Sequence, residues 1–268
     1  MKEGGFIMEK FNVLIDQIKS NALYVVSFLL IIAGLFVCSV IAERIIRGKK
    51  GITDKTSAAR RAASVGLLSA ISAVLMFFEV PMFFAPSFYK LDLSELPVMI
   101  GAYAFGPSVG VLIEFIKIIL KLFMKGTSTA FVGELANFAV GSSFVIPAAT
   151  LYYSNRTKKT ALKSCILGTI CITLFGTAFN AVYLLPAFAK LYGMPLEAIL
   201  EMGAKANPLA GNDIVTFVLA CVAPLNLIKG TVISLLTLLI YKKISPVLKG
   251  AGIGADLVSN REVQTEEN

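Results

Sequence analysis

The sequence predicts an all-α polytopic membrane protein, and two observations lead to this fold class. Of its 268 residues, 56% are hydrophobic and 16% are charged, and the mean hydropathy of +0.78 is outside the usual range of a soluble domain. Several apolar runs also reach the roughly 20 residues that a helix needs to cross the hydrocarbon core of a bilayer. No polar segment is long enough to form a separate soluble domain.

Five apolar runs predict transmembrane helices. They cover residues 22–41, 65–84, 131–153, 165–188 and 214–241. The first run follows a mostly polar segment and lacks a small-x-small cleavage site, so we expect a retained helix and not a signal peptide.

Residues 96–123 form either one kinked helix or two helices, because Gly106-Pro107 interrupts the apolar run. An extra crossing exchanges the sides of every later loop, so the Lys and Arg residues can decide between the two. Two helices, 96–105 and 108–123, place most basic residues on the cytoplasmic side, whereas one helix divides them equally. We therefore expect seven spans in the cell membrane, with the N-terminus outside and the C-terminus cytoplasmic.

The chain is expected to have four parts. An N-terminal segment, 1–44, carries an additional transmembrane helix, and a basic cytoplasmic linker, 45–61, follows it. Residues 62–245 form a six-helix membrane domain. The Gly-rich and then acidic tail, 246–268, is typical of a disordered cytoplasmic segment.

The composition excludes several classes of chemistry. The chain has no histidine, which excludes His-based metal sites and Ser-His-Asp catalysis. Four cysteines lie inside apolar runs without a Cys-x-x-Cys pair, so we expect them to act as small hydrophobic residues. The net charge of +8 collects in short loops, where membrane topology explains it. We expect no metal, no cofactor and no nucleic-acid partner.

Three polar side chains inside the predicted spans are the strongest functional signal. Lys229 lies in the middle of the last span, Asn226 lies on the same helix face, and Asn180 lies in the span before it. Lipid offers no hydrogen-bond partners, so such groups face protein, water or a ligand. Either they form a pocket for a small planar molecule with a polar edge, or they form an interhelical network in which Glu79 or Glu134 neutralises Lys229.

Other polar pairs have two interpretations as well. Glu114, Lys117 and Lys121 are spaced to pair along one helix, and neutralisation with snorkelling toward the outer surface explains them best. Glu134 and Asn137 either cap the outer end of a helix or line the mouth of a pocket.

Small residues recur at helical spacing in the second span. Ala62, Gly66 and Ala70 form one stripe, and Ser69 and Ala73 form its neighbour. Such faces let helix backbones approach closely, within the chain or against another subunit. The aromatic loop 81–96 is either an interfacial belt or a lid over a pocket.

Several motifs make the chain resemble the S components of energy-coupling factor (ECF) transporters, within them the riboflavin-specific member. They cover about residues 61 to 245 in the order of that family. The matching pieces are Leu91-Asp-Leu-Ser-Glu-Leu-Pro97, Gly106-Pro107, Glu114-Phe-Ile-Lys117, Gly133-Glu-Leu-Ala-Asn137, Phe179-Asn180 through Pro186, and Pro224-Leu-Asn-Leu-Ile-Lys-Gly230.

The resemblance implies a non-enzymatic vitamin receptor with an outward-opening pocket, closed by the loop between the first two core helices. Asn180, Asn226 and Lys229 would then hold riboflavin as the transported ligand, with Glu79 lining the pocket. The small-residue stripes, Ala62, Gly66, Ala70, Ser69 and Ala73, would dock on a transmembrane coupling subunit joined to two cytosolic ATPases. Import would need their ATP hydrolysis, since this chain has no Gly-x-x-x-x-Gly-Lys-Ser/Thr loop.

Two departures from the family and two alternatives stay open. The helix 22–41 is additional to the six-helix plan, and the outer loop 190–212, with Glu197 and Glu201, is longer than expected. The ligand could be another vitamin: folate and pantothenate carboxylates suit Lys229, whereas cationic thiamine does not. A membrane enzyme acting on lipid is the other alternative, but the cluster of acids, histidines or cysteines typical of such enzymes is missing from the sequence.

Overall fold

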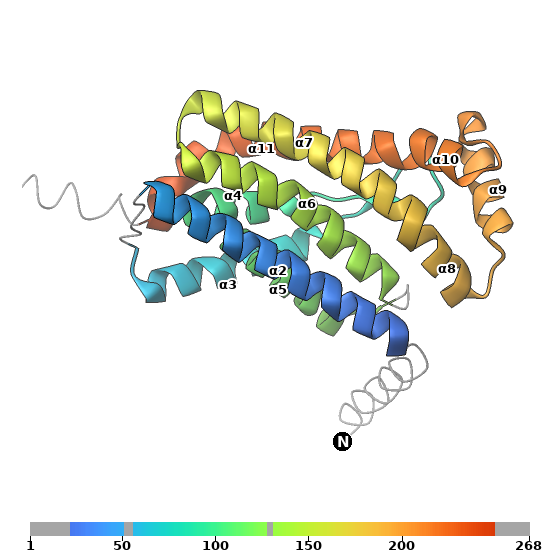
Figure 1. Ribbon diagram of the computed structural model, residues 1–268, viewed down its shortest axis with the longest axis horizontal. Coiled ribbons are helices and arrows are strands. Elements are labelled where there is room, and N and C mark those ends of the chain that lie inside the picture. Colours follow the sequence, from blue (N-terminus) through green and yellow to red (C-terminus); the bar gives the residue numbers. More distant parts are fainter. Residues whose placement is uncertain (1–21, 51–55, 128–130, 250–268) are drawn as a thin grey trace, which may run out of the picture.

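The computed structural model describes residues 22–50, 56–127 and 131–249 (Figure 1). In these ranges the chain is helical apart from its loops and one pair of two-residue strands, which confirms the predicted all-α fold. Five of the described helices are long and apolar enough to cross a membrane. The polar segment before residue 22 and the tail from residue 250 on lie outside the described residues.

Helix α2 (Ala22–Lys50) extends beyond the predicted end at residue 41 and packs on α5 (Pro107–Lys125) and α6 (Val132–Ser154). Figure 1 shows it lying along this face of the bundle. Glu43, almost fully buried, accepts a hydrogen bond of 3.1 Å from the backbone N–H of Ser108 in the first turn of α5. A carboxylate at that position satisfies an open donor of the helix end and complements its dipole.

The same helix makes a second polar contact with the bundle. Arg47 pairs with Glu43 at 2.8 Å and donates a hydrogen bond of 3.3 Å to the hydroxyl of Tyr153 on α6. The additional helix is therefore joined to the core by specific contacts and not by apolar packing alone.

Helix α3 (Ala58–Leu75) ends well before residue 84, so the predicted span 65–84 is wrong at its outer end. The chain instead forms an antiparallel hairpin of β1 (Val80–Pro81) and β2 (Lys90–Leu91). Pro81 has no N–H for a helix, and the apolar residues around it pack against the bundle from within a loop.

The two small-residue stripes of α3 have different surroundings. Ala62, Gly66 and Ala70 are exposed, whereas Ser69 and Ala73 are buried inside the bundle. The prediction of one shared docking face is therefore wrong for Ser69 and Ala73, because they already pack within this chain.

The Gly106-Pro107 break separates two helices, as the distribution of basic residues predicts. α4 (Glu95–Phe105) ends at Gly106, whose φ of +112° is one that residues with a Cβ rarely adopt, and Pro107 opens α5. Helix α4 contacts α3, α5, α6 and α11 (Ala223–Lys249), and nearly all its residues are buried. A short apolar helix thus forms the centre of the bundle.

The remaining elements continue the bundle and cover one end of it. The long helix α7 (Lys158–Phe179) packs on α6 and α11. Five shorter elements follow: η1 (Asn180–Leu184), α8 (Leu185–Tyr192), α9 (Leu196–Ala206), η2 (Pro208–Ala210) and α10 (Ile214–Phe217). The predicted outer loop 190–212 therefore contains a helix, and Figure 1 shows α8 to α10 gathered at one end.

Two π-helical turns interrupt the long spans, η1 and η3 (Val218–Val222). Each widens the helix by one residue per turn, a feature often found at functional sites. Asn180 is the first residue of η1, and Asn226 follows η3 by one turn.

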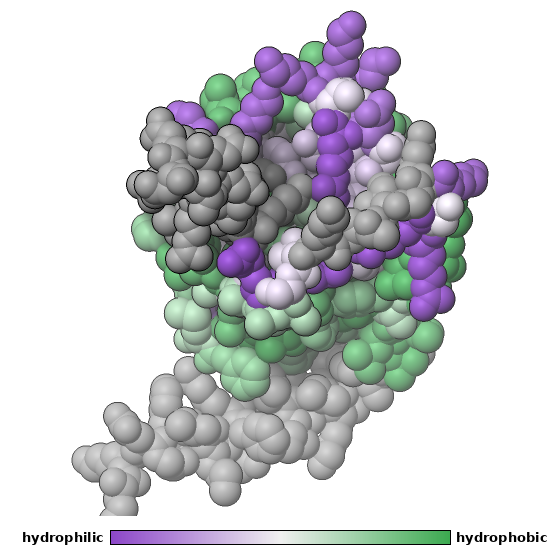
Figure 2. All heavy atoms as spheres, turned by 90° about the vertical axis from the view of Figure 1, so that its left-hand side faces the viewer, coloured by the Kyte–Doolittle hydropathy of each residue, from purple (hydrophilic) through white to green (hydrophobic). Residues whose placement is uncertain are grey.

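Hydrophilic side chains gather at the opposite end of the bundle, where α3 and α7 begin and α11 ends (Figure 2). Exposed basic residues there come from α3, α7, α11 and the loop between α6 and α7. They include Arg60, Arg156, Lys158, Lys159, Lys163, Lys242 and Lys243.

Candidate functional site

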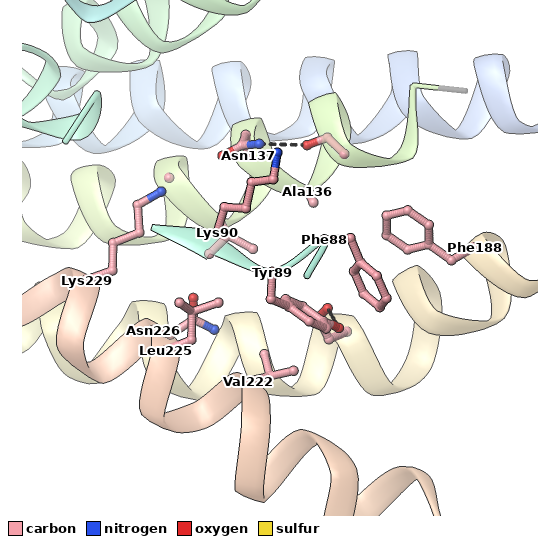
Figure 3. Close-up of a pocket in the computed structure, with 14 residues that line it drawn as sticks. Phe88, Tyr89, Lys90, Ala136, Asn137, Phe188, Val222, Leu225, Asn226 and Lys229 are labelled. Atoms are coloured by element: carbon pink, nitrogen blue, oxygen red, sulfur yellow. Dashed lines mark hydrogen bonds between the residues drawn. The ribbon is translucent and has the colours of Figure 1, made fainter. Parts of the chain in front are cut away.

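A cavity of about 110 Å³ lies between the hairpin, α6, η1, α8 and the η3–α11 segment (Figure 3). Its walls combine apolar and aromatic side chains with a few amides and two ammonium groups. The lining residues are Phe88, Tyr89, Lys90, Gly133, Ala136, Asn137, Val140, Gly141, Asn180, Phe188, Val222, Leu225, Asn226 and Lys229.

The structure brings the three predicted polar residues together, since Asn180, Asn226 and Lys229 all line this cavity. Each is at most 8% exposed. Asn226 and Lys229 lie one turn apart on α11, and η1 places Asn180 on the neighbouring span. Helix periodicity accounts for the shared face of Asn226 and Lys229, whereas the packing of neighbouring spans brings Asn180 to them.

The carboxamide of Asn226 is the most telling group of the cavity. Its Nδ2 atom is buried and has no hydrogen-bond partner among the described residues. Gly176 on α7 leaves room for it, because a Cβ there would lie 2.5 Å from Nδ2. An unpaired buried amide is unfavourable, so such a donor beside a cavity indicates a ligand that accepts from it.

Asn180 has partners within the chain. Its Oδ1 accepts a hydrogen bond of 2.8 Å from the Tyr89 hydroxyl, and its Nδ2 donates to the carbonyl oxygen of Gly176 at 2.7 Å. The Tyr89 ring lies 4.7 Å from Phe88 and 6.1 Å from Phe217, centroid to centroid. The hairpin thus delivers an aromatic wall and a hydroxyl directly to the cavity.

Lys229 is held by acids other than the two expected. Its Nζ lies 2.9 Å from Glu95 Oε1 and 3.3 Å from Asp92 Oδ2, so the expectation that Glu79 or Glu134 neutralises it is wrong. The reason is topological: the loop after the hairpin enters the bundle and places both acids beside α11, where Glu95 is the first residue of α4.

The pair Glu114–Lys117 forms as predicted, at 2.7 Å, but it does not snorkel. Both side chains are fully buried, and Lys117 also reaches Glu95 at 3.2 Å. Lys121 pairs instead with Glu134 on α6, at 3.4 Å. The snorkelling interpretation fails for Lys117 because α4 and the loop before it cover this face of α5.

Glu79 does not line the cavity and lies in the loop between α3 and the hairpin. It pairs with Lys90 at 2.7 Å and with Lys125 at 3.1 Å. Burial raises the pKa of this carboxyl, but the hydrogen bonds and charges of Lys90 and Lys125 outweigh burial and hold the pKa below its ordinary value. Its link to the cavity is indirect, through the lining residue Lys90.

Of the two interpretations given for Glu134 and Asn137, the cavity lining applies to Asn137 and the position at a helix end to Glu134. Asn137 lines the cavity and donates to the carbonyl oxygen of Gly133 at 2.9 Å. Glu134 lies in the first turn of α6 and accepts a hydrogen bond of 3.0 Å from the Thr127 hydroxyl.

Two groups of site residues were not assigned to the site from the sequence. Phe88, Tyr89 and Lys90 line the cavity from the loop 81–96, for which an interfacial belt was the usual interpretation and a lid the alternative. Asp92 and Glu95 lie outside the predicted spans, so their position in the sequence did not indicate that they are buried. Their presence in the matching motif 91–97, beside a buried lysine that needs counter-charges, was the available signal.

Comparisons with known proteins agree on one family. The family model "ECF transporter, substrate-specific component" matches residues 60–241. The riboflavin transporter RibU of Staphylococcus aureus (strain TCH60) is 34% identical over 191 residues, which cover 71% of this chain and 93% of that protein. The riboflavin transporter FmnP of Bacillus subtilis (strain 168) is 32% identical, covering 68% and 90%.

A solved structure is similar as well. It is described as the structure of the S component of a bacterial ECF transporter. Its sequence is 30% identical to this chain, and the two structures superpose with a TM-score of 0.56. The match covers 72% of this chain and 99% of that one. Helix α2 precedes the residues that the family model matches.

Proposed function

This chain belongs to the family of substrate-specific components of ECF transporters, and from that premise we propose that its cavity captures riboflavin for import. The family consists of transporter subunits and not of enzymes, and the chain is a multi-pass membrane protein. Riboflavin is proposed because relatives carrying that substrate in their names match about 70% of the chain.

The observation that carries the proposal is the unpaired amide of Asn226 beside Lys229. The pyrimidine edge of a flavin alternates acceptor, donor and acceptor, so a carboxamide can both donate to it and accept from it. The Lys229 ammonium can donate to a further flavin oxygen. Apolar and aromatic walls from Phe88, Phe188 and Leu225 suit the tricyclic ring.

Entry of so large a ligand requires the hairpin to move. The cavity of about 110 Å³ is smaller than the roughly 300 to 1,000 Å³ of a typical ligand pocket. Tyr89 and Phe88 occupy one side of it, and Tyr89 also holds the amide oxygen of Asn180. Displacing Tyr89 would enlarge the cavity and release that oxygen at once, which supports the lid interpretation of loop 81–96.

The distribution of charge supports one orientation in the membrane. Exposed Arg and Lys side chains gather at the end opposite the hairpin and α9 (Figure 2). Because basic residues are enriched on the cytoplasmic side of membrane proteins, we propose that this end faces the cytoplasm. The N-terminus then lies outside, the C-terminus lies in the cytoplasm, and the cavity opens toward the outer face. The exposed stripe Ala62, Gly66 and Ala70 is proposed to dock on the transmembrane coupling subunit that joins two cytosolic ATPases.

A ligand panel tests the substrate. The purified protein in detergent is titrated with riboflavin, thiamine, folate and pantothenate, by flavin fluorescence for riboflavin and by calorimetry for all four. We expect saturable binding and quenching with riboflavin alone. Tight binding of folate or pantothenate without riboflavin would overturn the substrate assignment and keep the receptor role.

Transport is tested separately. Proteoliposomes that hold this chain alone are compared with proteoliposomes that also hold a coupling subunit and its ATPases, with ATP inside. We expect riboflavin uptake in the second preparation only. Uptake by the chain alone would contradict the proposed dependence on partners.

A further inference from the structure

Five buried ionisable side chains form one continuous network at the inner side of the cavity. They come from the loop after the hairpin, α4, α5 and α11, and successive N···O distances run from 2.7 to 3.3 Å. We call them the inner cluster: Asp92, Glu95, Glu114, Lys117 and Lys229. Only Lys229 belongs both to this cluster and to the lining of the cavity.

The charges of the inner cluster do not cancel. It holds three carboxyl groups and two ammonium groups, and every member is at most 8% exposed. An uncompensated charge in such surroundings is costly, and a buried acid usually avoids the cost by taking up a proton. The described residues contain no group of three acids or cysteines placed to hold a metal ion, so a proton is the simplest cation to balance the cluster.

Glu114 is the carboxyl best placed to hold that proton. Glu95 contacts both lysines, and Asp92 pairs with Lys229 and accepts the backbone N–H of Ser94 at 2.8 Å. Glu114 pairs with Lys117 alone, through Oε1, and shares that lysine with Glu95, while its Oε2 has no hydrogen-bond partner among the described residues.

Among the described residues, Lys117 is the cation that pairs with Glu114. On α6 it faces Gly141, where a Cβ would lie 2.6 Å from Oε1, and the acid of that helix, Glu134, pairs with Lys121. Gly141 also lines the cavity. Glu114 therefore lies directly behind the cavity wall, in a position where its protonation and the occupation of the cavity can influence each other.

We propose that the inner cluster is a proton-binding site, centred on Glu114, that is linked to the ligand site through Lys229. The inference rests on the proposed function. A ligand oxygen that accepts from Lys229 draws its ammonium away from Glu95 and Asp92. The remaining carboxylates then share less positive charge, so the cluster binds its proton more tightly when the ligand is present. Linkage makes this effect reciprocal.

The proposal predicts the direction in which riboflavin affinity changes with pH and an upper limit for that change. Binding takes up a fraction of a proton, so affinity falls as the pH rises through the range in which the cluster titrates. The slope is at most about tenfold in affinity per pH unit, which is the limit for one linked proton.

The test is calorimetry of riboflavin binding to the whole protein in detergent, at one pH, in buffers with different heats of ionisation. The enthalpy then reports the number of protons exchanged. We expect net uptake of up to one proton in the wild type at some pH between 6 and 9. We expect no uptake in Glu114→Gln, and unchanged uptake in the control Glu197→Gln, an exposed acid on α9.

The possible outcomes separate this inference from the proposed function. Riboflavin binding without proton uptake at any pH in that range, or with proton release, overturns the inference and keeps the function. An equal uptake in Glu114→Gln overturns the assignment to the cluster. Gel filtration in detergent shows whether Glu114→Gln folds. If it does not, the proton uptake on riboflavin binding is measured in Lys229→Gln instead. Proton uptake equal to that of the wild type in this variant overturns the link through Lys229. Absence of riboflavin binding by the wild type sinks the proposed function itself.

Discussion

Two groups of ion pairs begin at the open end of the hairpin, one with Glu79 just before β1 and one with Asp92 just after β2, and they differ in contact with water. The outer group joins Glu79 to Lys90 and Lys125, whose side chains are 37% and 49% exposed. The inner cluster has similar distances, yet the side chains alone of its lysines, Lys117 and Lys229, are 0% and 10% exposed. Equal geometry therefore does not mean equal energy, because removing one partner matters most where water cannot replace it.

The largest expected effect is on stability. Lys117→Met would leave buried carboxylates without one of their two cations, and we expect a loss of roughly 3 to 5 kcal/mol. The matched change in the outer group, Lys125→Met, should cost less than about 1 kcal/mol. Denaturant unfolding in detergent measures both, and equal losses would show that burial does not separate the two groups.

The next effect is on the ligand. Lys229→Met should weaken riboflavin binding by roughly 100-fold, since truncating one side of a buried charged contact usually costs 2 to 5 kcal/mol. Lys90→Met, which also alters the lining, should weaken it less than about fivefold because water can screen the Lys90 charge. Fluorescence titration measures the riboflavin affinity of both variants. A greater loss of affinity in Lys90→Met would contradict the proposal that Lys229 contributes more to binding than Lys90.

A smaller effect on riboflavin affinity is expected when one methyl group is added beside Asn226. Gly176→Ala places a Cβ 2.5 Å from Asn226 Nδ2, so the amide has to shift. We expect about a tenfold loss of riboflavin affinity, from a shift of the order of an ångström in one contact. Gly34→Ala on α2 has no atom within 4 Å of its Cβ and is the control. Unchanged affinity in Gly176→Ala would show that the position of this amide is not critical.

The smallest effect concerns acid stability. The pKa of Glu79 is lowered in the folded protein, so its contribution to stability is complete above its ordinary value of 4.5 and is lost as the pH falls through the folded value. The stability difference between wild type and Glu79→Gln should therefore be less than about 1 kcal/mol at pH 7 and shrink below about pH 4.5. A difference that grows on acidification would contradict the ion pairs with Lys90 and Lys125.

Much of the fold could be predicted from local patterns in the sequence. Hydropathy predicted the long spans. The distribution of basic residues over the loops favoured two helices, α4 and α5, over one helix kinked at Gly106. The helix repeat placed Asn226 and Lys229 on one face. These features depend on short stretches of chain, which is why sequence reasoning reached them.

What the sequence could not show depends on contacts between distant segments. The hairpin replaced the predicted end of the span 65–84 because its apolar residues pack against α9, η3 and the rest of that end of the bundle. Asp92 and Glu95 became partners of Lys229 only because the following loop enters the bundle. Glu43, on a helix outside the family match, caps α5 across a gap of 65 residues in the chain.

The most direct test of the central claim is a riboflavin titration of Asn226→Ala beside the control Asn212→Ala, an exposed amide. If the unpaired amide of Asn226 binds the flavin, its removal should lower affinity by at least about tenfold, the typical cost of a lost buried hydrogen bond, while Asn212→Ala leaves affinity unchanged. Wild-type affinity in a folded Asn226→Ala protein would contradict the account.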